Sequence, residues 1–294
     1  MHPPILEKIL SSTDGTKIYA RAVGNSQKLA IMFVHGLALS SSVFDKLFMD
    51  ERLLDEFFLV SYDMRGHGGS GKPETMEGHV SSLYAADFAA VVQAFDIKQP
   101  PILVGWSLGA TAAADVCEHL GANALSAIVY VCGLPYTGAI MNEVGTPFIL
   151  GLLPGLFSTD DVALLSTTKI TFVDSLFNDP ARVPRDFKWS LLGSTIAQFP
   201  IVSQLVLSRP QDPTKLHEAG AKGLPLLLLS GSADKQVNGD VVVTAMAPFF
   251  NDIDVKNIPG GSHILFYDAQ DEFVKALLKF AIRVRKSTEF AMKP

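Results

Sequence analysis

Apolar residues recur along the chain in two patterns, as short continuous runs and as longer stretches with helical spacing. The short runs are rich in valine, isoleucine, leucine and phenylalanine, which is typical of strands covered on both faces. Between several of them, apolar residues recur every three or four positions, as on one face of a helix. This alternation predicts parallel strands joined by crossover helices. The predicted strands cover residues 18–23, 29–34, 57–62, 101–104, 125–132, 224–230 and 255–258, and helices are predicted over 43–54, 83–95 and 272–283.

The alternation stops between residues 135 and 220. This region has no clear strand, and prolines such as Pro154, Pro180 and Pro200 divide it into amphipathic helical pieces. We therefore expect residues 1–134 and 221–294 to form one core, with residues 135–220 inserted after the sixth strand as a helical lid. The last residues, 286–294, have the composition of a solvated tail.

The amino-acid composition bears on which binding partners and which cellular compartment we expect. With 24 basic and 30 acidic residues and no block of like charge, the chain offers no basic patch of the kind that binds nucleic acid. The first ten residues lack the features of a secretory signal, and no apolar stretch is long enough to cross a bilayer. The two cysteines, Cys117 and Cys132, indicate buried thiols in a reducing compartment. We expect a cytoplasmic protein without a membrane span, and its oligomeric state is open.

The stretch PPILVGWSLGATAAA, residues 100–114, carries the strongest chemical signal. A buried strand leads into Gly105-Trp106-Ser107-Leu108-Gly109, and an alanine-rich helix follows. The pentapeptide matches the G-x-S-x-G nucleophile elbow, in which a tight turn projects the serine hydroxyl and the glycines let strand and helix approach closely. Alone, it also fits a glycine turn with a helix-capping serine. The strand before it and the helix after it favour the elbow, with Ser107 as the nucleophile.

A serine hydroxyl needs a base to remove its proton and an acid to orient that base. His263 follows the last predicted strand and a Gly-Gly-Ser turn, which places it at the carboxyl edge of the sheet, beside Ser107. Asp234 follows the apolar run LPLLLLSGS at the same edge, and its alternative role is to cap a turn with Ser232. A second acid position, after the sixth strand, holds Cys132, which cannot orient an imidazole as a carboxylate does. Ser107, Asp234 and His263 are therefore the predicted catalytic residues.

Serine attack on a carbonyl also requires N–H groups for the negative charge that forms on the oxygen. One predicted strand ends at His35-Gly36, and the amide of Leu37 that follows can point to the same carbonyl as the amide of Leu108. Leu37 and Leu108 are the predicted oxyanion amides. We interpret His35, and the glycine-rich turn YDMRGHGGSG around Asp63, as structural hydrogen-bonding groups near this edge.

As a set, these segments resemble the α/β-hydrolase superfamily, and most of all its small-molecule esterase, cofactor-free haloperoxidase and carbon–carbon bond hydrolase branches. The resemblance rests on HGL after the third strand, DMRGHGGS after the fourth, GWSLG after the fifth, and the order Ser107, Asp234, His263. It implies an α/β fold, a mostly parallel eight-stranded sheet with helices on both faces and a helical lid after strand 6. It also implies acyl transfer through Ser107 without a metal or cofactor. Haloalkane dehalogenases and most epoxide hydrolases of this fold carry aspartate at this position, which disfavours both activities.

The predicted lid is rich in aromatic and aliphatic residues and poor in charge, so we expect a small, apolar, ester-like substrate. Trp106, Phe148, Leu152 and Trp189 are the predicted pocket residues. Three functions stay open at this point. They are hydrolysis of a carboxylic ester or lactone, carbon–carbon bond hydrolysis or lysis with the same three residues, and ligand reception on a hydrolase scaffold with very slow turnover.

Overall fold

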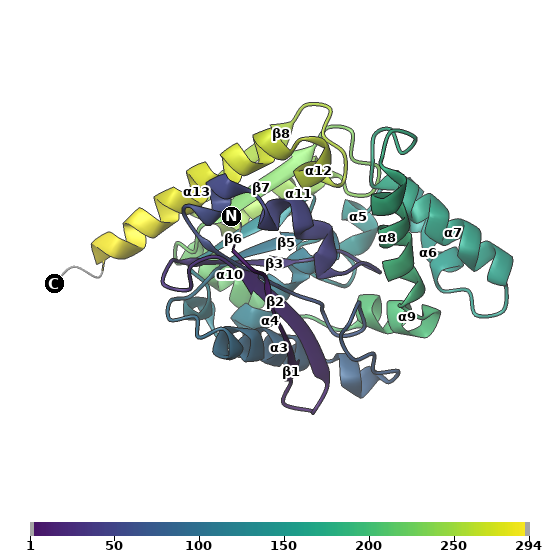
Figure 1. The fold of residues 1–294 in the computed structure, drawn as a ribbon, viewed down its shortest axis with the longest axis horizontal. Helices are drawn as coiled ribbons and strands as arrows, with labels where there is room; N and C mark the ends of the chain where they lie inside the picture. Colours follow the sequence, from purple (N-terminus) through teal and green to yellow (C-terminus); the bar gives the residue numbers. More distant parts are fainter. Residues whose placement is uncertain (1–2, 292–294) are drawn as a thin grey trace.

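An eight-stranded sheet forms the centre of the computed structural model, which describes residues 3–291 and their side chains up to residue 287. The strand order is β1-β2-β4-β3-β5-β6-β7-β8 (Figure 1). The pairs β1–β2 and β2–β4 are antiparallel, and all other neighbours are parallel. The expected eight-stranded, mostly parallel sheet is therefore confirmed. Its strands are β1 (Leu6–Ser11), β2 (Lys17–Val23), β3 (Ala30–Val34), β4 (Phe58–Tyr62), β5 (Ile102–Trp106), β6 (Ala127–Val131), β7 (Leu226–Gly231) and β8 (Ile253–Ile258).

Helices cover both faces of the sheet (Figure 1). On one face, α3 (Ser81–Ala94) and α10 (Thr214–Ala221) both pack against α4 (Ala112–His119). On the other, the long α13 (Gln270–Ala291) packs against α2 (Glu51–Leu54). The remaining core helices are short and connect strands to these elements. They are η1 (Ser41–Phe44), α1 (Asp45–Phe48), η2 (Met76–His79), η3 (Ser107–Thr111), η4 (Ala122–Ala124), α11 (Gly239–Met246), η5 (Ala247–Phe249) and α12 (Leu265–Asp268).

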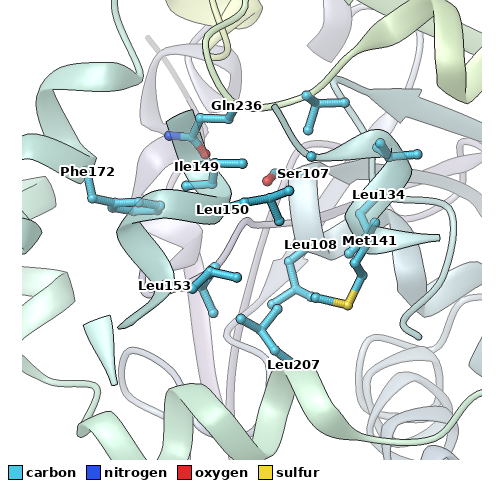
Figure 2. A pocket seen from close by; sticks show the side chains of 14 residues that line it. Ser107, Leu108, Leu134, Met141, Ile149, Leu150, Leu153, Phe172, Leu207 and Gln236 are labelled. Carbon is cyan, nitrogen blue, oxygen red and sulfur yellow. The ribbon is translucent and has the colours of Figure 1, made fainter. Parts of the chain in front are cut away.

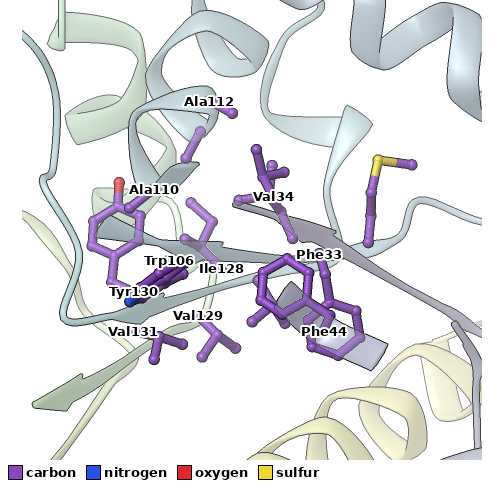
Figure 3. Close-up of a cluster of buried hydrophobic side chains, with 14 of the residues drawn as sticks. Phe33, Val34, Phe44, Trp106, Ala110, Ala112, Ile128, Val129, Tyr130 and Val131 are labelled. Atoms are coloured by element: carbon purple, nitrogen blue, oxygen red, sulfur yellow. The ribbon is translucent and has the colours of Figure 1, made fainter. Parts of the chain in front are cut away.

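The middle of the sheet is fully enclosed. Every residue of β3, β4, β5 and β6 is buried, which explains why these strands read as continuous apolar runs. Figure 3 shows side chains of β3, β5 and β6, including Phe33, Trp106 and Tyr130, in one cluster with Phe44. The rings of Phe33 and Phe44 lie 5.2 Å apart, within the range of a favourable aromatic pair. The strand ends that carry the candidate site therefore extend from a close-packed hydrophobic core.

Between β6 and β7 the chain forms six helices and, within residues 132–225, no strand. We call the first five of these the insertion helices: α5 (Met141–Val144), α6 (Pro147–Leu156), α7 (Val162–Ser175), α8 (Arg185–Ile196) and α9 (Pro200–Ser208). α6 to α9 lie together at one end of the sheet (Figure 1). The sixth helix, α10, packs against α4 instead. The segment that leaves the core therefore ends before Thr214, earlier than the predicted boundary at residue 220.

Three local predictions differ from the structure. Residues 43–54 form no single helix, because Asp50 accepts a hydrogen bond from the Arg52 backbone N–H at 3.1 Å and starts α2 anew. Strand β1 was not predicted, since it is an edge strand whose residues are exposed or half-buried. Residues 286–291 are helical rather than a tail, because α13 continues to Ala291, and residues 292–294 lie outside the described part of the chain.

Among the described residues, no single helix combines the length and the apolar composition that crossing a bilayer requires. The pair α8–α9 meets both requirements only when taken together, and its two helices are bent by 80°. The helix α6 is apolar but shorter than a span.

Gly109 has no room for a side chain, so it can be used to test the packing at the serine corner, the turn of residues 105–109 that carries Ser107. A Cβ there would lie 2.2 Å from the backbone oxygen of Val34. We expect Gly109→Ala to lower the free energy of unfolding by about 3 kcal/mol, because the backbone must shift to accept the methyl group. Gly193 in α8 is the matched control: nothing lies within 4 Å of its Cβ position, so Gly193→Ala should stabilise by about 0.5–1 kcal/mol. Urea denaturation followed by circular dichroism measures both values, and equal stability of the two variants would contradict this packing.

Candidate active site

Ser107 stands where β5 passes into η3, in a strained backbone conformation. Its φ is +53°, in the left-handed region that residues with a Cβ rarely adopt. The flanking glycines allow the close approach behind it, since a Cβ on Gly105 would lie 2.3 Å from Ala110 Cα. Such strain costs of the order of 1–3 kcal/mol and is characteristic of functional positions. The turn thus has the shape that the nucleophile elbow requires.

His263 and Asp234 form a buried pair next to this turn. The imidazole Nδ1 lies 2.9 Å from Asp234 Oδ2 and 3.0 Å from Oδ1. His263 lies in the loop after β8, and Asp234 lies in the loop after β7. Asp234 Oδ1 also accepts hydrogen bonds from the backbone N–H groups of Gln236 at 2.7 Å and Val237 at 3.1 Å. The structure therefore brings together the two residues that the sequence predicts as base and acid.

The Asp234 carboxyl group is held in its ionised form. Burial by itself raises the pKa of Asp234, but attraction to His263 and the hydrogen bonds from His263 and Gln236 outweigh it, so this pKa lies below its usual value. With Nδ1–H donating to the carboxylate, a neutral imidazole carries its free lone pair on Nε2. The pair is thus arranged to present Nε2 as a proton acceptor.

Trp106 connects the His263 loop to the serine corner. Its indole N–H donates to the His263 backbone oxygen at 2.8 Å, and its ring lies 5.5 Å from the imidazole. The edge-to-face contact of Trp106 with Phe266, at 5.1 Å, places the side chain in the core (Figure 3). The prediction that Trp106 lines the pocket is therefore wrong. Successive residues along a strand point to opposite sides, so Trp106 points away from the side that Ser107 faces.

Leu37 and Leu108, the predicted oxyanion residues, belong to the two segments that meet at Ser107. The end of β3 comes close to the elbow, since a Cβ on Gly36 would lie 3.1 Å from Ser107 Cβ. Leu108 follows Ser107 directly in η3. Among the residues that the structure describes, neither amide donates to a backbone oxygen outside its own element. Two unpaired N–H groups next to a serine are the arrangement that stabilises an oxyanion.

The other polar groups at this edge have structural roles, as predicted. His35 Nε2 accepts a hydrogen bond from the Met64 N–H at 3.1 Å, and its Nδ1 lies 2.8 Å from the backbone oxygen of Gly36. Burial lowers the pKa of His35, which keeps the ring neutral with both nitrogens occupied. Asp63 accepts hydrogen bonds from the backbone N–H groups of Ser41 at 2.6 Å and Gly69 at 2.7 Å. Neither residue is free to exchange a proton with a substrate.

One cluster at the site has the residue types of a metal centre. Cys132, Asp234 and His263 each place a potential ligand atom within 4.8 Å of the others. Burial raises the pKa of the Cys132 thiol well above its usual value, which disfavours the thiolate that binds metals. The Nδ1 of His263 and the carboxylate of Asp234 are already bonded to each other. The geometry therefore fits a proton-transfer pair better than a set of metal ligands.

An apolar cavity adjoins Ser107 (Figure 2). The serine corner and the end of β3 form one side of it, and α5, α6 and α7 form much of the other. Ser107 and Gln236 are the two polar residues among those that border it. The complete lining is Leu37, Ser107, Leu108, Leu134, Met141, Val144, Gly145, Ile149, Leu150, Leu153, Phe172, Leu207, Gln236 and Val237.

The predicted pocket residues of the insertion do not line this cavity. Phe148 and Leu152 lie on α6, but Ile149 and Leu153, one position further along the same helix, face the cavity instead. One residue corresponds to about 100° of rotation around a helix, so the predicted pair lies on another face. Phe148 is 42% exposed and Trp189 is 56% exposed, and both therefore contact solvent. These three predictions are wrong.

The sequence prediction also missed Gln236. This residue lies two positions after Asp234, in the same loop, so its proximity to a predicted catalytic residue was the available signal. Phe172, Leu207 and Met141 join the lining from three different insertion helices. Their selection depends on how those helices pack over Ser107, for which the hydrophobic pattern holds no signal.

The comparisons with known proteins agree with this geometry. A sequence profile of the alpha/beta hydrolase family matches residues 31–276. This chain belongs to the alpha/beta hydrolase family. The match spans most of the sheet together with the loops that carry Ser107, Asp234 and His263.

Two curated proteins share parts of this sequence. A non-heme chloroperoxidase of Streptomyces lividans is 31% identical over 128 residues, which cover 43% of this chain and 44% of that protein. A 2-(acetamidomethylene)succinate hydrolase of Mesorhizobium japonicum is 43% identical over 80 residues, 27% of each chain. The chain therefore matches less than half the length of these two curated relatives. An esterase from Rhodococcus sp. ECU1013 has a similar fold, with a TM-score of 0.82, 24% identity, and coverage of 93% of this chain and 98% of that one.

The two tryptophans of this family member provide a test of how the His263 loop is held. Trp106→Phe removes the indole N–H bonded to the His263 oxygen and leaves space in the core, so we expect the free energy of unfolding to fall by about 2 kcal/mol. Trp189→Phe is the matched control, because this side chain is exposed and should change stability by less than about 0.5 kcal/mol. Chemical denaturation of the three proteins measures both effects. A Trp106→Phe variant as stable as the parent would show that the indole does not support this loop.

Proposed function

We propose that this chain is a serine hydrolase that cleaves the carboxylic ester or lactone of a small apolar substrate. The observation that carries the proposal is the buried Asp234–His263 pair beside the strained Ser107 turn. Three further features support it: two unpaired amides at Leu37 and Leu108, an apolar cavity that reaches Ser107, and membership of the alpha/beta hydrolase family. Together they supply a nucleophile, a base, an oriented acid and a site for negative charge.

The first half of the proposed reaction forms an acyl-enzyme. Ser107 Oγ attacks the ester carbonyl while His263 Nε2 takes its proton, and Asp234 stabilises the imidazolium through Nδ1–H. The N–H groups of Leu37 and Leu108 bind the oxyanion of the tetrahedral intermediate. As the carbon–oxygen bond breaks, His263 returns the proton to the leaving alcohol.

The second half releases the acid. Water attacks the acyl group on Ser107 and gives a proton to His263, and the same two amides bind the second oxyanion. Collapse of this intermediate returns the proton to Ser107 Oγ and frees the carboxylic acid. Every proton moves between the substrate, water, Ser107 and His263, so the cycle needs no group beyond the residues named here and water.

The cavity supports a substrate without formal charge. None of its lining side chains is ionisable other than the Ser107 hydroxyl, and no lysine, arginine, aspartate or glutamate is among them. A charged acyl group would therefore lose its hydration without gaining a partner, which costs several kcal/mol.

Active-site labelling tests the role of Ser107 directly. A fluorophosphonate probe should label the parent protein and not Ser107→Ala, because the probe reacts only with an activated serine. The parent should also hydrolyse 4-nitrophenyl esters with short to medium apolar acyl chains, and Ser107→Ala should lose at least about 10³-fold in kcat. Equal labelling of both proteins would eliminate Ser107 as the nucleophile. A labelled protein that hydrolyses no ester or lactone of the panel would instead favour carbon–carbon bond cleavage or ligand reception.

The pH dependence of ester hydrolysis tests the role of His263. Only a neutral imidazole can take the serine proton, so kcat/KM should fall as the solution is acidified. The pKa of Asp234 lies below its usual value, so protonation of this carboxylate does not account for the expected loss of activity. Stopped-flow or plate assays from about pH 9 to about pH 4, with circular dichroism as the folding control, measure the profile. A rate that stays constant throughout would contradict histidine as the base.

A further inference from the structure

Gln236 is the one polar side chain, besides Ser107, among the described residues that border the cavity. It is 3% exposed and lies in the loop after β7, among apolar neighbours such as Ile149 and Phe172. Burying an amide group without hydrogen-bond partners costs about 1–3 kcal/mol. The amide atom that has a hydrogen-bond partner, and the amide atom that has none, therefore indicate which ligand group the cavity can bind.

The side-chain amide is held in one orientation. Gln236 Nε2 lies 2.8 Å from Ser175 Oγ. Ser175 Oγ donates its own proton to the Phe172 backbone oxygen at 2.7 Å, so it can only accept a hydrogen bond from Gln236. The amide nitrogen, and not the oxygen, accordingly faces Ser175 in the structure.

The amide oxygen is left on the cavity side. Figure 2 shows the Gln236 nitrogen directed toward the side where Phe172 lies and the oxygen directed toward Ile149. Within the described part of the chain, Oε1 accepts no hydrogen bond. A carbonyl oxygen without a partner, in an otherwise apolar cavity, is a site for a ligand N–H or O–H.

The backbone of Gln236 is also fixed, which prevents the oxygen from moving out of the cavity. Its N–H donates to Asp234 Oδ1 at 2.7 Å, and its carbonyl oxygen accepts from the Thr146 N–H at 2.9 Å. Thr146 immediately precedes α6, so the loop is held between the acid and an insertion helix. An acceptor fixed in advance loses little conformational entropy when a ligand binds.

We propose that Gln236 Oε1 selects substrates whose cavity-filling group carries one uncharged hydrogen-bond donor, a secondary amide N–H or a hydroxyl. The proposal rests on the proposed ester hydrolysis, which it narrows to a substrate class. An ammonium donor is excluded, because no lining residue carries a negative charge to compensate it. Ser175 acts as the positioning residue that keeps Oε1, rather than Nε2, toward the substrate.

The test uses three 4-nitrophenyl esters with acyl groups of equal chain length. One chain is a plain hydrocarbon, the second contains a secondary amide, and the third contains the same amide with its nitrogen methylated. The second and third differ only in the N–H donor. We expect kcat/KM of the parent protein to be about tenfold higher for the secondary amide than for the N-methyl amide, as expected for one neutral hydrogen bond.

Two variants distinguish the effect of the Gln236 hydrogen bond on kcat/KM from the effect of a changed cavity shape. Gln236→Met has a side chain of similar length without the amide oxygen, and the ratio between the two amide esters should fall to about one. Ser175→Ala keeps Gln236 but releases its amide, which lowers the ratio because Nε2 can then turn toward the substrate. A purely structural role of either residue would change both amide esters by the same factor and leave the ratio unchanged.

Binding provides a second readout that does not depend on turnover. Isothermal calorimetry of the two amide esters with Ser107→Ala should give a dissociation constant about tenfold lower for the secondary amide. Equal constants, equal kcat/KM values in the parent, or an unchanged ratio in Gln236→Met would overturn the assignment to Gln236. Absence of both ester turnover and fluorophosphonate labelling would overturn ester hydrolysis instead, and the binding ratio would then decide the Gln236 proposal alone.

Discussion

The close approach of three backbone segments around Ser107 is the constraint on which the rest of the site depends. β5 turns directly into η3, and η3 packs onto the end of β3 so tightly that position 109 has no space for a Cβ. Ser107 has a positive φ at this contact, and the end of β3 approaches it closely at Gly36. The strain in one residue is small compared with the burial of four complete strands around it.

Two buried charge pairs near the site are compensated by hydrogen bonds. Asp234 has His263 and two backbone N–H groups as partners. A second buried charge pair lies behind the elbow, where Arg209 donates to Asp115 at 3.1 Å and to Thr111 at 2.5 Å. Since Arg209 immediately follows α9 and Thr111 ends η3, this pair connects the insertion to the helix that carries Ser107. Removing one partner of such a pair typically lowers the free energy of unfolding by about 3–5 kcal/mol.

The insertion helices are joined to the acid loop as well. Gly145 pairs with Val237 in an isolated bridge, and the Thr146 N–H donates to the Gln236 oxygen. The same loop therefore contacts His263 through Asp234 and borders the apolar cavity through Gln236. Movement of the insertion would affect both the proposed chemistry and the proposed selection of substrate, because one short segment takes part in each.

By itself, the sequence determined most of the sheet and the tight turn at Ser107, and it predicted the Asp234–His263 pair, because buried strands and tight glycine turns leave local patterns. It also predicted Leu37 and Leu108 as oxyanion amides, since each follows a recognisable turn. Only the tertiary structure decided which residues line the cavity. α6 is apolar around most of its surface, so its hydrophobic pattern holds no information on whether Phe148 or Ile149 faces inward. The orientation of the Gln236 amide likewise depends on Ser175, which is 61 positions away in the chain, and contacts of that range leave no periodic signal.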